Sequence, residues 1–170
     1  MMETAAWIDQ SLRRLDLAGS RGAAAANYLR RHRVGLGFHD QPTAARWTIF
    51  GGIQLHPRYA LAPPDDPYAL SLIVHETRHL QQGFFTALSV MGELEAWQEQ
   101  FEFYQSLTGR YAPAAALEPI IAELMTLSMT DRAHLRRARE LMRDYAGPKY
   151  RIYWLPLYPL GKEIAHWLNW

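Results

Sequence analysis

The sequence predicts an α+β fold, mostly helical, with a small sheet of two or three strands ahead of a long helix over residues 67–82. Two observations predict this class. Apolar side chains recur at helical spacing over most of the 170 residues. β-rich runs separated by a Gly-Gly pair lie within residues 34–59. Because no internal repeat or long linker divides the chain, we expect one domain over residues 1–170.

Helices and then a short sheet are expected before the long helix. Apolar spacing predicts helices over residues 4–17 and 21–32. Three β-rich runs follow, over residues 34–38, 46–50 and 53–59. The pair Gly51 and Gly52 between the last two runs predicts a hairpin, because both residues can take positive φ. Pro57 cannot donate a hydrogen bond to a neighbouring strand, so its strand lies at an edge or ends there.

The long helix has clear boundaries in the sequence. Asp66 offers a capping side chain, Pro67 suits the first turn, and Gly83 suits the end. Further helices are expected over residues 87–106, 118–127, 131–145 and 161–169.

The composition excludes several classes of protein. Lys and Arg number 18 against 17 Asp and Glu, and a net charge of +1 argues against a nucleic-acid partner. The chain has no cysteine, which excludes disulfides and a thiolate zinc site and suits the cytoplasm. The first residues lack the apolar core of a signal peptide, and no run of about 18 apolar residues would cross a membrane. We therefore expect a cytoplasmic protein with no membrane partner, and the oligomeric state stays open.

One short motif carries candidate chemistry. In LIVHETRHLQQ, residues 72–82, His75 and His79 are four positions apart, so both imidazoles project from one side of a helix. Each can offer one nitrogen to a metal at about 2.0–2.1 Å. Glu76 is turned by about 100° from His75 and can flank the ion, where it could accept a proton from water. The apolar residues before the motif favour a zinc site over a solvated pair of histidines.

The motif and the glutamates that follow it resemble the thermolysin-like clan of gluzincin zinc metallopeptidases. Glu95 follows the second histidine by sixteen residues, and Glu99 stands one turn further on. The resemblance implies a zincin-like fold, zinc as cofactor, Glu95 as third ligand and Glu99 as the carboxylate that orients His75. Glu93 is the main alternative to Glu95 as the third ligand. The two point about 200° apart on a helix, so only one can face the histidines.

The resemblance covers about residues 53–103 and is not complete within them. Arg78 and Gln81 stand where the clan's helix usually has uncharged and apolar residues, but neither position is a ligand. Arg78 could point to solvent or pair with a carboxylate on the next helix. Glu95, Glu99 and Glu102 also form one helical stripe, which could simply be a solvated face.

A metallopeptidase also needs a donor for the developing oxyanion. The candidates lie in the C-terminal part of the chain: Tyr145, Tyr150, Tyr153, Tyr158 and His166. Tyr153 and His166 are preferred, because each is followed by a tryptophan that could anchor its backbone.

The leading interpretation is a zinc metallopeptidase that acts on a peptide or protein, with Glu76 as general base. One alternative is a di-iron carboxylate protein of the ferritin-like kind, since Glu76 with His79 and Glu163 with His166 both match ExxH. Another is a catalytically silent regulatory module with the zincin shape. A cytoplasmic protease that cleaves a single regulator is a further possibility. The sequence indicates no substrate.

Overall fold

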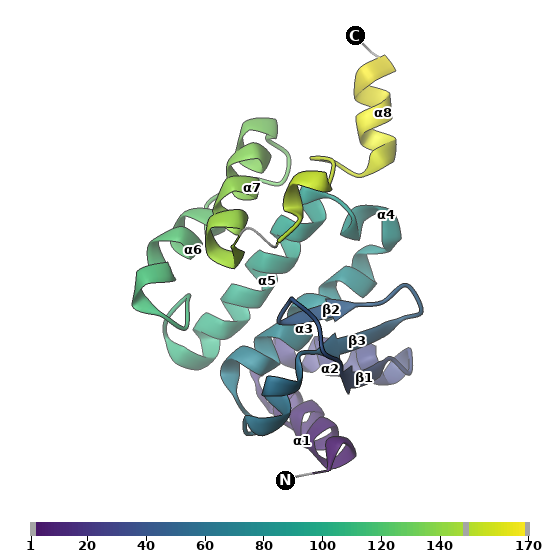
Figure 1. The fold of residues 1–170 in the computed structure, drawn as a ribbon, viewed down its shortest axis with the longest axis vertical. Coiled ribbons are helices and arrows are strands. Elements are labelled where there is room, and N and C mark those ends of the chain that lie inside the picture. Colours follow the sequence, from purple (N-terminus) through teal and green to yellow (C-terminus); the bar gives the residue numbers. More distant parts are fainter. Residues whose placement is uncertain (1–2, 148–149, 169–170) are drawn as a thin grey trace.

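The computed structural model describes residues 3–147 and 150–168, and the side chains of His166 and Trp167 also lie outside this description. It is mostly helical with one three-stranded sheet, which confirms the predicted α+β class (Figure 1). No described helix combines the length and apolar character needed to cross a membrane.

The first two helices follow the predicted ranges closely. They are α1 (Thr4–Leu17) and α2 (Gly19–Arg31). Gly22 lets them approach, because a Cβ atom there would lie 2.5 Å from the carbonyl oxygen of Leu15. Trp7 is buried, and its indole N–H donates to the carbonyl of Ala62 at 2.9 Å. That bond ties the first helix to the segment that leads into the long helix.

The sheet contains β1 (Gly35–Phe38), β2 (Ala45–Trp47) and β3 (Gly52–Leu55) in the order β1-β3-β2. β3 pairs in parallel with β1 and antiparallel with β2, so the predicted hairpin is present. Of the glycine pair, Gly51 takes positive φ, at 76°. β3 ends before Pro57, which begins the short 3-10 helix η1 (Pro57–Leu61). β2 is left at an edge of the sheet.

The long helix α3 (Pro67–Gln82) has the predicted ends. The Asp66 carboxylate accepts from the backbone N–H of Ala69 at 2.7 Å, and Gly83 ends the helix with φ of 75°. α3 packs along α5 (Val90–Thr108), and the short α4 (Phe84–Ala87) connects the two. α5 begins later than predicted because Ser89 caps it, accepting from the backbone N–H of Gly92 at 3.0 Å.

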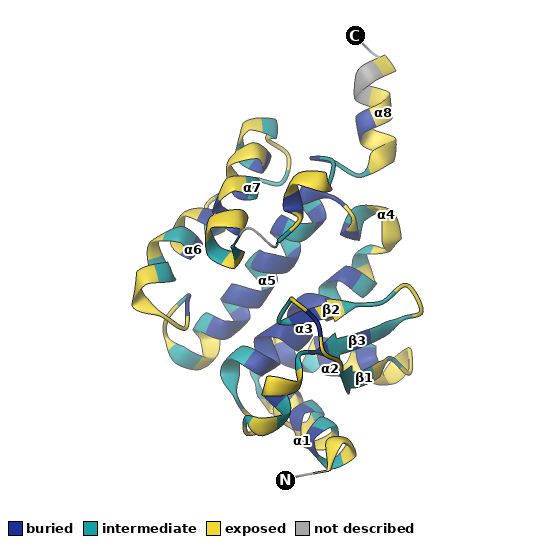
Figure 2. Ribbon diagram, viewed as in Figure 1, coloured by how far each residue is buried: buried dark blue, intermediate teal, exposed yellow. Residues whose placement is uncertain are grey.

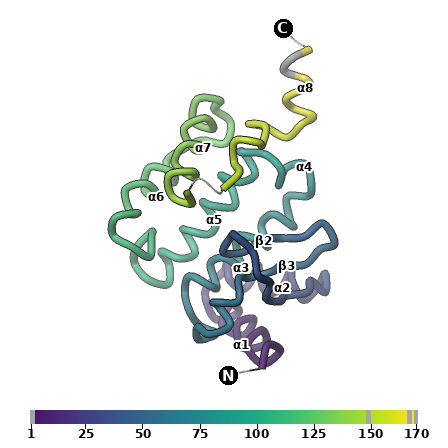
Figure 3. The backbone as a smooth tube through the Cα atoms, viewed as in Figure 1, coloured from purple at the N-terminus to yellow at the C-terminus, as the bar shows by residue number. Residues whose placement is uncertain are grey.

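The C-terminal helices cover the other side of α5. They are α6 (Glu118–Met125) and α7 (Arg132–Ala146), preceded by η2 (Ala115–Leu117) and followed by η3 (Ile152–Trp154) and α8 (Leu160–Leu168). After α7 the chain passes the start of α5, as Figure 3 shows. There the backbone N–H groups of Val90 and Met91 donate to carbonyls of Pro156 and Leu157 at 2.8 and 2.9 Å. α8 projects from the body of the molecule in Figure 1.

Buried apolar side chains form two clusters. Figure 2 shows that much of α3 and α5 consists of buried residues. The first joins α1, α2 and the sheet to one side of α3. The second joins α5 to α6, α7 and the segment after α7. Tyr68 packs against both clusters. α3 therefore packs mainly in the first cluster, which also includes Phe103 of α5, and the rest of the buried face of α5 packs in the second. The candidate site lies where these two helices face each other.

Candidate metal centre

Two imidazoles and one carboxylate meet between α3 and α5. The Nε2 atoms of His75 and His79 are 3.0 Å apart. Glu93, in the first turn of α5, places Oε1 3.6 Å from Nε2 of His79 and Oε2 4.0 Å from Nε2 of His75. One ligand atom from each residue lies within 4.8 Å of the others. None of the three side chains is more than 13% exposed, so the group is enclosed.

This group fits a zinc ion. Zinc binds imidazole nitrogen at about 2.0–2.1 Å and carboxylate oxygen at about 2.0–2.2 Å in tetrahedral geometry, which sets the ligand atoms about 3.3–3.5 Å apart. The distances of 3.0, 3.6 and 4.0 Å bracket that range. Two imidazoles with one carboxylate are a ligand set typical of zinc enzymes, and three protein ligands leave a fourth position open.

The structure places Glu93, not Glu95, beside the histidines, so the position predicted for Glu95 is wrong. The carboxylate of Glu95 accepts from Arg78 at 2.5 Å and from the side-chain amide of Gln82 at 2.7 Å. Arg78 thus pairs with a carboxylate on the next helix, one of its two predicted positions. The physical reason is the rotation of α5, which turns Glu93 toward α3 and leaves Glu95 at its flank.

Glu95 nevertheless contributes to the site through Gln82. The amide oxygen of Gln82 lies 3.2 Å from Nδ1 of His79, and its nitrogen donates to Glu95 and to the carbonyl of Gly92. An acceptor at Nδ1 fixes the tautomer that leaves Nε2 free as a ligand. Gln82 therefore orients His79 and is itself held by Glu95.

Glu99 does not orient His75, and that prediction is also wrong. Its carboxylate lies 3.3 Å from the guanidinium of Arg21 on α2, on the solvated flank of α5. Nδ1 of His75 makes no hydrogen bond within the described residues. The carbonyl of Ala96 and the side chain of Gln100 are the groups nearby that favour its protonated form. Burial, and then the neighbouring His79, outweigh them and hold the pKa of His75 well below its ordinary value.

Glu76 is buried beside this candidate metal-binding group, with 5% of the residue exposed. Burial raises the pKa of Glu76 to about 8, and the negative charge of Glu93 acts in the same direction. The backbone N–H of Trp47 in β2 opposes this by favouring the ionised carboxylate. Positive charge nearby favours the ionised form of a carboxyl group. Glu76 is therefore a carboxyl group whose protonation state responds to the charge of its surroundings.

Among the five candidate oxyanion donors, Tyr150 lies at the group. Its hydroxyl donates to Oε2 of Glu93 and accepts from the indole N–H of Trp97 at 3.2 Å. Burial, and then Glu93, raise the pKa of Tyr150 well above its ordinary value, so the phenol keeps its proton. The backbone N–H of Tyr150 donates to the carbonyl of Gly147 at the end of α7, at 3.0 Å.

The preference for Tyr153 is wrong. Tyr153 is 48% exposed, and its ring lies under the guanidinium groups of Arg139 and Arg143, 5.7 and 5.4 Å from its centroid. The reason is the short 3-10 helix, which buries Ile152 and turns Tyr153 toward α7. The hydroxyl of Tyr158 donates to a backbone carbonyl at 2.8 Å, at Thr130.

The other preferred donor, His166, has a side chain outside the described residues. It belongs to α8, which projects from the body of the molecule (Figure 1). In the same ExxH motif, Glu163 pairs with Arg132 at 3.2 Å and accepts from the backbone N–H of Tyr158 at 3.1 Å. Glu163 is therefore not part of the group formed by the motif histidines.

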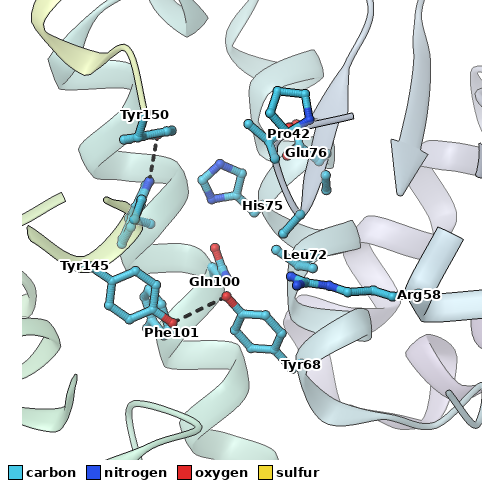
Figure 4. A pocket seen from close by; sticks show the side chains of 15 residues that line it. Pro42, Arg58, Tyr68, Leu72, His75, Glu76, Gln100, Phe101, Tyr145 and Tyr150 are labelled. Atoms are coloured by element: carbon cyan, nitrogen blue, oxygen red, sulfur yellow. Dashed lines mark hydrogen bonds between the residues drawn. The ribbon is translucent and has the colours of Figure 1, made fainter. Parts of the chain in front are cut away.

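Two cavities adjoin the candidate metal-binding group. The first, of about 370 Å³, is lined by His75 and Glu76 (Figure 4). The second, of about 770 Å³, is lined by Glu93 and Trp47. Both are lined by Pro42, Thr43 and Tyr150. The candidate ligands and base therefore face space on two sides.

Sequence reasoning missed Gln82, Trp97 and Gln100. A signal for two of them is present in the sequence: Trp97 and Gln100 follow Glu93 by four and seven residues, the spacing of one helix face. No sequence pattern indicates Gln82, because its role depends on how the end of α3 packs against Gly92.

No protein-family model, no curated protein and no solved structure matches this chain. The resemblance to the gluzincin clan therefore stays a hypothesis based on the motif and its spacing.

Proposed function

We propose that this protein is a zinc-dependent peptidase, with His75, His79 and Glu93 as zinc ligands and Glu76 as general base. The proposal is carried by the enclosed group of two imidazole nitrogens and one carboxylate, with a buried carboxyl group beside it. Zinc at such a site supplies a Lewis acid and lowers the pKa of water at its open position.

Glu76 holds and moves the proton in this mechanism. Its place next to His75 on α3 fixes it beside the ligands. Positive charge at the site favours its ionised form, and the N–H of Trp47 acts in the same direction. The carboxylate accepts a proton from the attacking water and delivers it to the leaving amine.

Tyr150 supplies the hydrogen-bond donor for the oxyanion. Its phenol is neutral, and its one proton, which is donated to Glu93 in the free protein, would turn to the oxyanion when a substrate binds. A donor of this kind acts best at about 2.7–3.1 Å from the oxygen that gains charge. Trp97 holds the tyrosine from the other side.

An extended peptide is the substrate that the surroundings suit. β2 pairs antiparallel with β3, and next to its two ends the carbonyl of Ala44 accepts from His56 and the N–H of Thr48 donates to Gly52. Because pairing alternates along a strand, the backbone groups of Ala45 and Trp47 turn to the other side, toward α3. Apart from the N–H of Trp47, which is directed at Glu76, this edge can bind a peptide as an added strand. The two cavities beside His75, Glu76 and Glu93 leave room for the substrate peptide to extend in both directions.

Metal analysis with one variant tests the proposal. We expect close to one zinc per chain, lost when His75 or His79 is changed to alanine. We expect Glu76→Gln to keep zinc and fold but to cleave a casein or mixed-peptide substrate on the order of 10²–10⁴-fold more slowly. Glu140→Gln is a matched control, because Glu140 lies on α7 and pairs with Arg137 at 3.2 Å.

Other outcomes decide between the alternatives. Two irons per chain would contradict the zinc site and favour the di-iron protein. Bound zinc without cleavage of any peptide would favour a silent regulatory module. Unchanged activity of Glu76→Gln would remove Glu76 from the mechanism. A cytoplasmic location belongs to the proposal and is based on the cysteine-free composition.

A further inference from the structure

We infer that the cavity beside His75 and Glu76 is a substrate subsite for a carboxylate group, with Arg58 as its cationic partner. The inference rests on the proposed function, because it assigns an acidic group to the peptide substrate. Two sources share this chemistry: the C-terminal carboxylate of a peptide, and the side chain of an Asp or Glu within it.

One end of this cavity is rich in hydrogen-bond donors. Figure 4 shows Arg58 reaching in toward Tyr68 and Gln100, on the other side of His75 from Tyr150. The hydroxyls of Tyr68 and Tyr145 are 3.3 Å apart at this end. Burial raises the pKa of both phenols, so both keep their protons at neutral pH. A guanidinium and two hydroxyls can all donate to a carboxylate.

Arg58 is held in position but lacks an anionic partner. Its backbone N–H donates to Nδ1 of His56 at 3.1 Å. Its guanidinium donates to the hydroxyl of Tyr59 at 2.8 Å and lies 4.8 Å from the centre of that ring. Within residues 3–147 and 150–168, no Asp or Glu oxygen comes within 4.0 Å of it. Arg132, which lines another cavity, is by contrast paired with Glu163 at 3.2 Å.

The charges on the cavity wall set the direction in which an acidic group would lie. The residues that line the cavity include one acidic residue, Glu76, and one arginine, Arg58. Glu76 is at the catalytic end, beside His75. A substrate carboxylate is therefore attracted to the Arg58 end and repelled from the general base.

The size of the cavity places the carboxylate close to the bond that is cleaved. A volume of about 370 Å³ is at the small end of the range of about 300–1,000 Å³ found for small-molecule pockets. A C-terminal carboxylate bound here would make the enzyme remove a short end piece from a peptide. A side-chain carboxylate would make it cut near acidic residues.

Matched peptides test the inference in the zinc-loaded protein. One blocked apolar hexapeptide is made with a free C-terminal carboxylate, with a carboxamide, and as the carboxamide with Glu at each position in turn. We expect one acidic form to be cleaved with kcat/KM on the order of 10–100-fold above the neutral carboxamide, the effect of a hydrogen bond to a charged group. Mass spectrometry of the products then identifies the source of the carboxylate.

Variants assign the effect to this cavity. Arg58→Gln should abolish the preference, and Arg58→Glu should reverse it in favour of Lys-containing peptides. The double change Tyr68→Phe with Tyr145→Phe removes both hydroxyls together, so neither is left unpaired, and should weaken the preference. Like Arg58, Arg13 is an exposed arginine, but it lies on α1 and does not line the cavity, so Arg13→Gln removes the same charge and should leave the preference intact.

A binding measurement separates failure of this inference from failure of the proposed function. Metal-free protein, shown to be folded by circular dichroism, is titrated with N-acetyl-leucine and with N-acetyl-leucinamide by NMR. We expect the acid to bind on the order of 10-fold more tightly, and Arg58→Gln to remove the difference. Equal binding of the two, no binding of either, or a difference that persists in Arg58→Gln would overturn the subsite. A selective response without peptide cleavage would contradict the peptidase alone.

Discussion

Glu93 receives three contacts that single it out among the glutamates of α5. Its two oxygens face the Nε2 atoms of both motif histidines, and Tyr150 donates to one of them. Glu95 has its charge neutralised by Arg78 instead. We expect Glu93→Ala to weaken zinc binding by at least 100-fold, because it removes a ligand. Glu95→Ala should weaken it far less, since it acts only through Gln82.

A competition titration with a zinc-binding dye measures both affinities. Glu140→Ala is the control for the loss of an acidic residue. If Glu95→Ala lost more affinity than Glu93→Ala, the ligand assignment would have to be exchanged.

Glu95 and Glu93 lie on different faces of α5, and this difference explains the wrong prediction. Glu95, Glu99 and Glu102 form the partly exposed flank of α5, which is the solvated stripe considered as their alternative. Glu93 shares its face with Ala96, a buried residue. An enclosed ligand must lie on the buried face, so burial periodicity could have selected Glu93. The prediction of Glu95 followed the motif spacing of the gluzincin clan instead.

The predicted role of Tyr150 as oxyanion donor depends on its hydroxyl group alone. Tyr150→Phe keeps the ring against Trp97 and removes only the hydroxyl. We expect kcat to fall on the order of 10²–10³-fold, the usual loss for one oxyanion donor, with little change in KM. Tyr153→Phe, which alters an exposed ring, is the control. Equal kinetics for Tyr150→Phe and wild type would show that the donor lies elsewhere.

At the scale of elements, the cap of α3 determines where the motif helix begins. Asp66 accepts from the backbone N–H of Ala69 at 2.7 Å. Asp66→Ala should lower the free energy of unfolding by about 1 kcal/mol, as for other capping residues. Urea denaturation of the metal-free protein measures this change. Asp65→Ala is the control, because Asp65 is exposed and lies 3.7 Å from Arg14. Equal losses for the two variants would mean that the cap contributes nothing beyond its charge.

Local signals of this kind explain why elements were predictable and their contacts were not. Asp66, Pro67 and Gly83 fix the ends of α3 through backbone chemistry that the sequence displays directly. The contact of Tyr150 with Glu93 depends instead on how the segment over residues 150–158 packs on the start of α5. Pairing between segments over fifty residues apart has no local signature, so Tyr150 could be named as a candidate but not selected.

At the scale of the whole molecule, the candidate zinc ligands join the two apolar clusters. α3 carries the two histidines and packs mainly in the first cluster, whereas α5 carries Glu93 and packs mainly in the second, with Phe103 reaching the first. An ion bound by both helices therefore links the halves of the core and stabilises the folded state over the unfolded chain. Removing the ion should loosen this junction rather than either cluster.

Thermal unfolding with and without zinc tests this link. With free zinc at 100 times its dissociation constant, binding adds about 2.7 kcal/mol, which corresponds to a rise in Tm of about 5–11 °C for a chain of this size. Glu93→Ala should lose most of the rise, because the ion is then held by α3 alone, while Glu140→Ala should keep it. An equal rise in Glu93→Ala and wild type would mean that zinc binds without α5. The junction between the clusters would then be held by side-chain packing between α3 and α5, with the histidine pair of α3 as an isolated metal site.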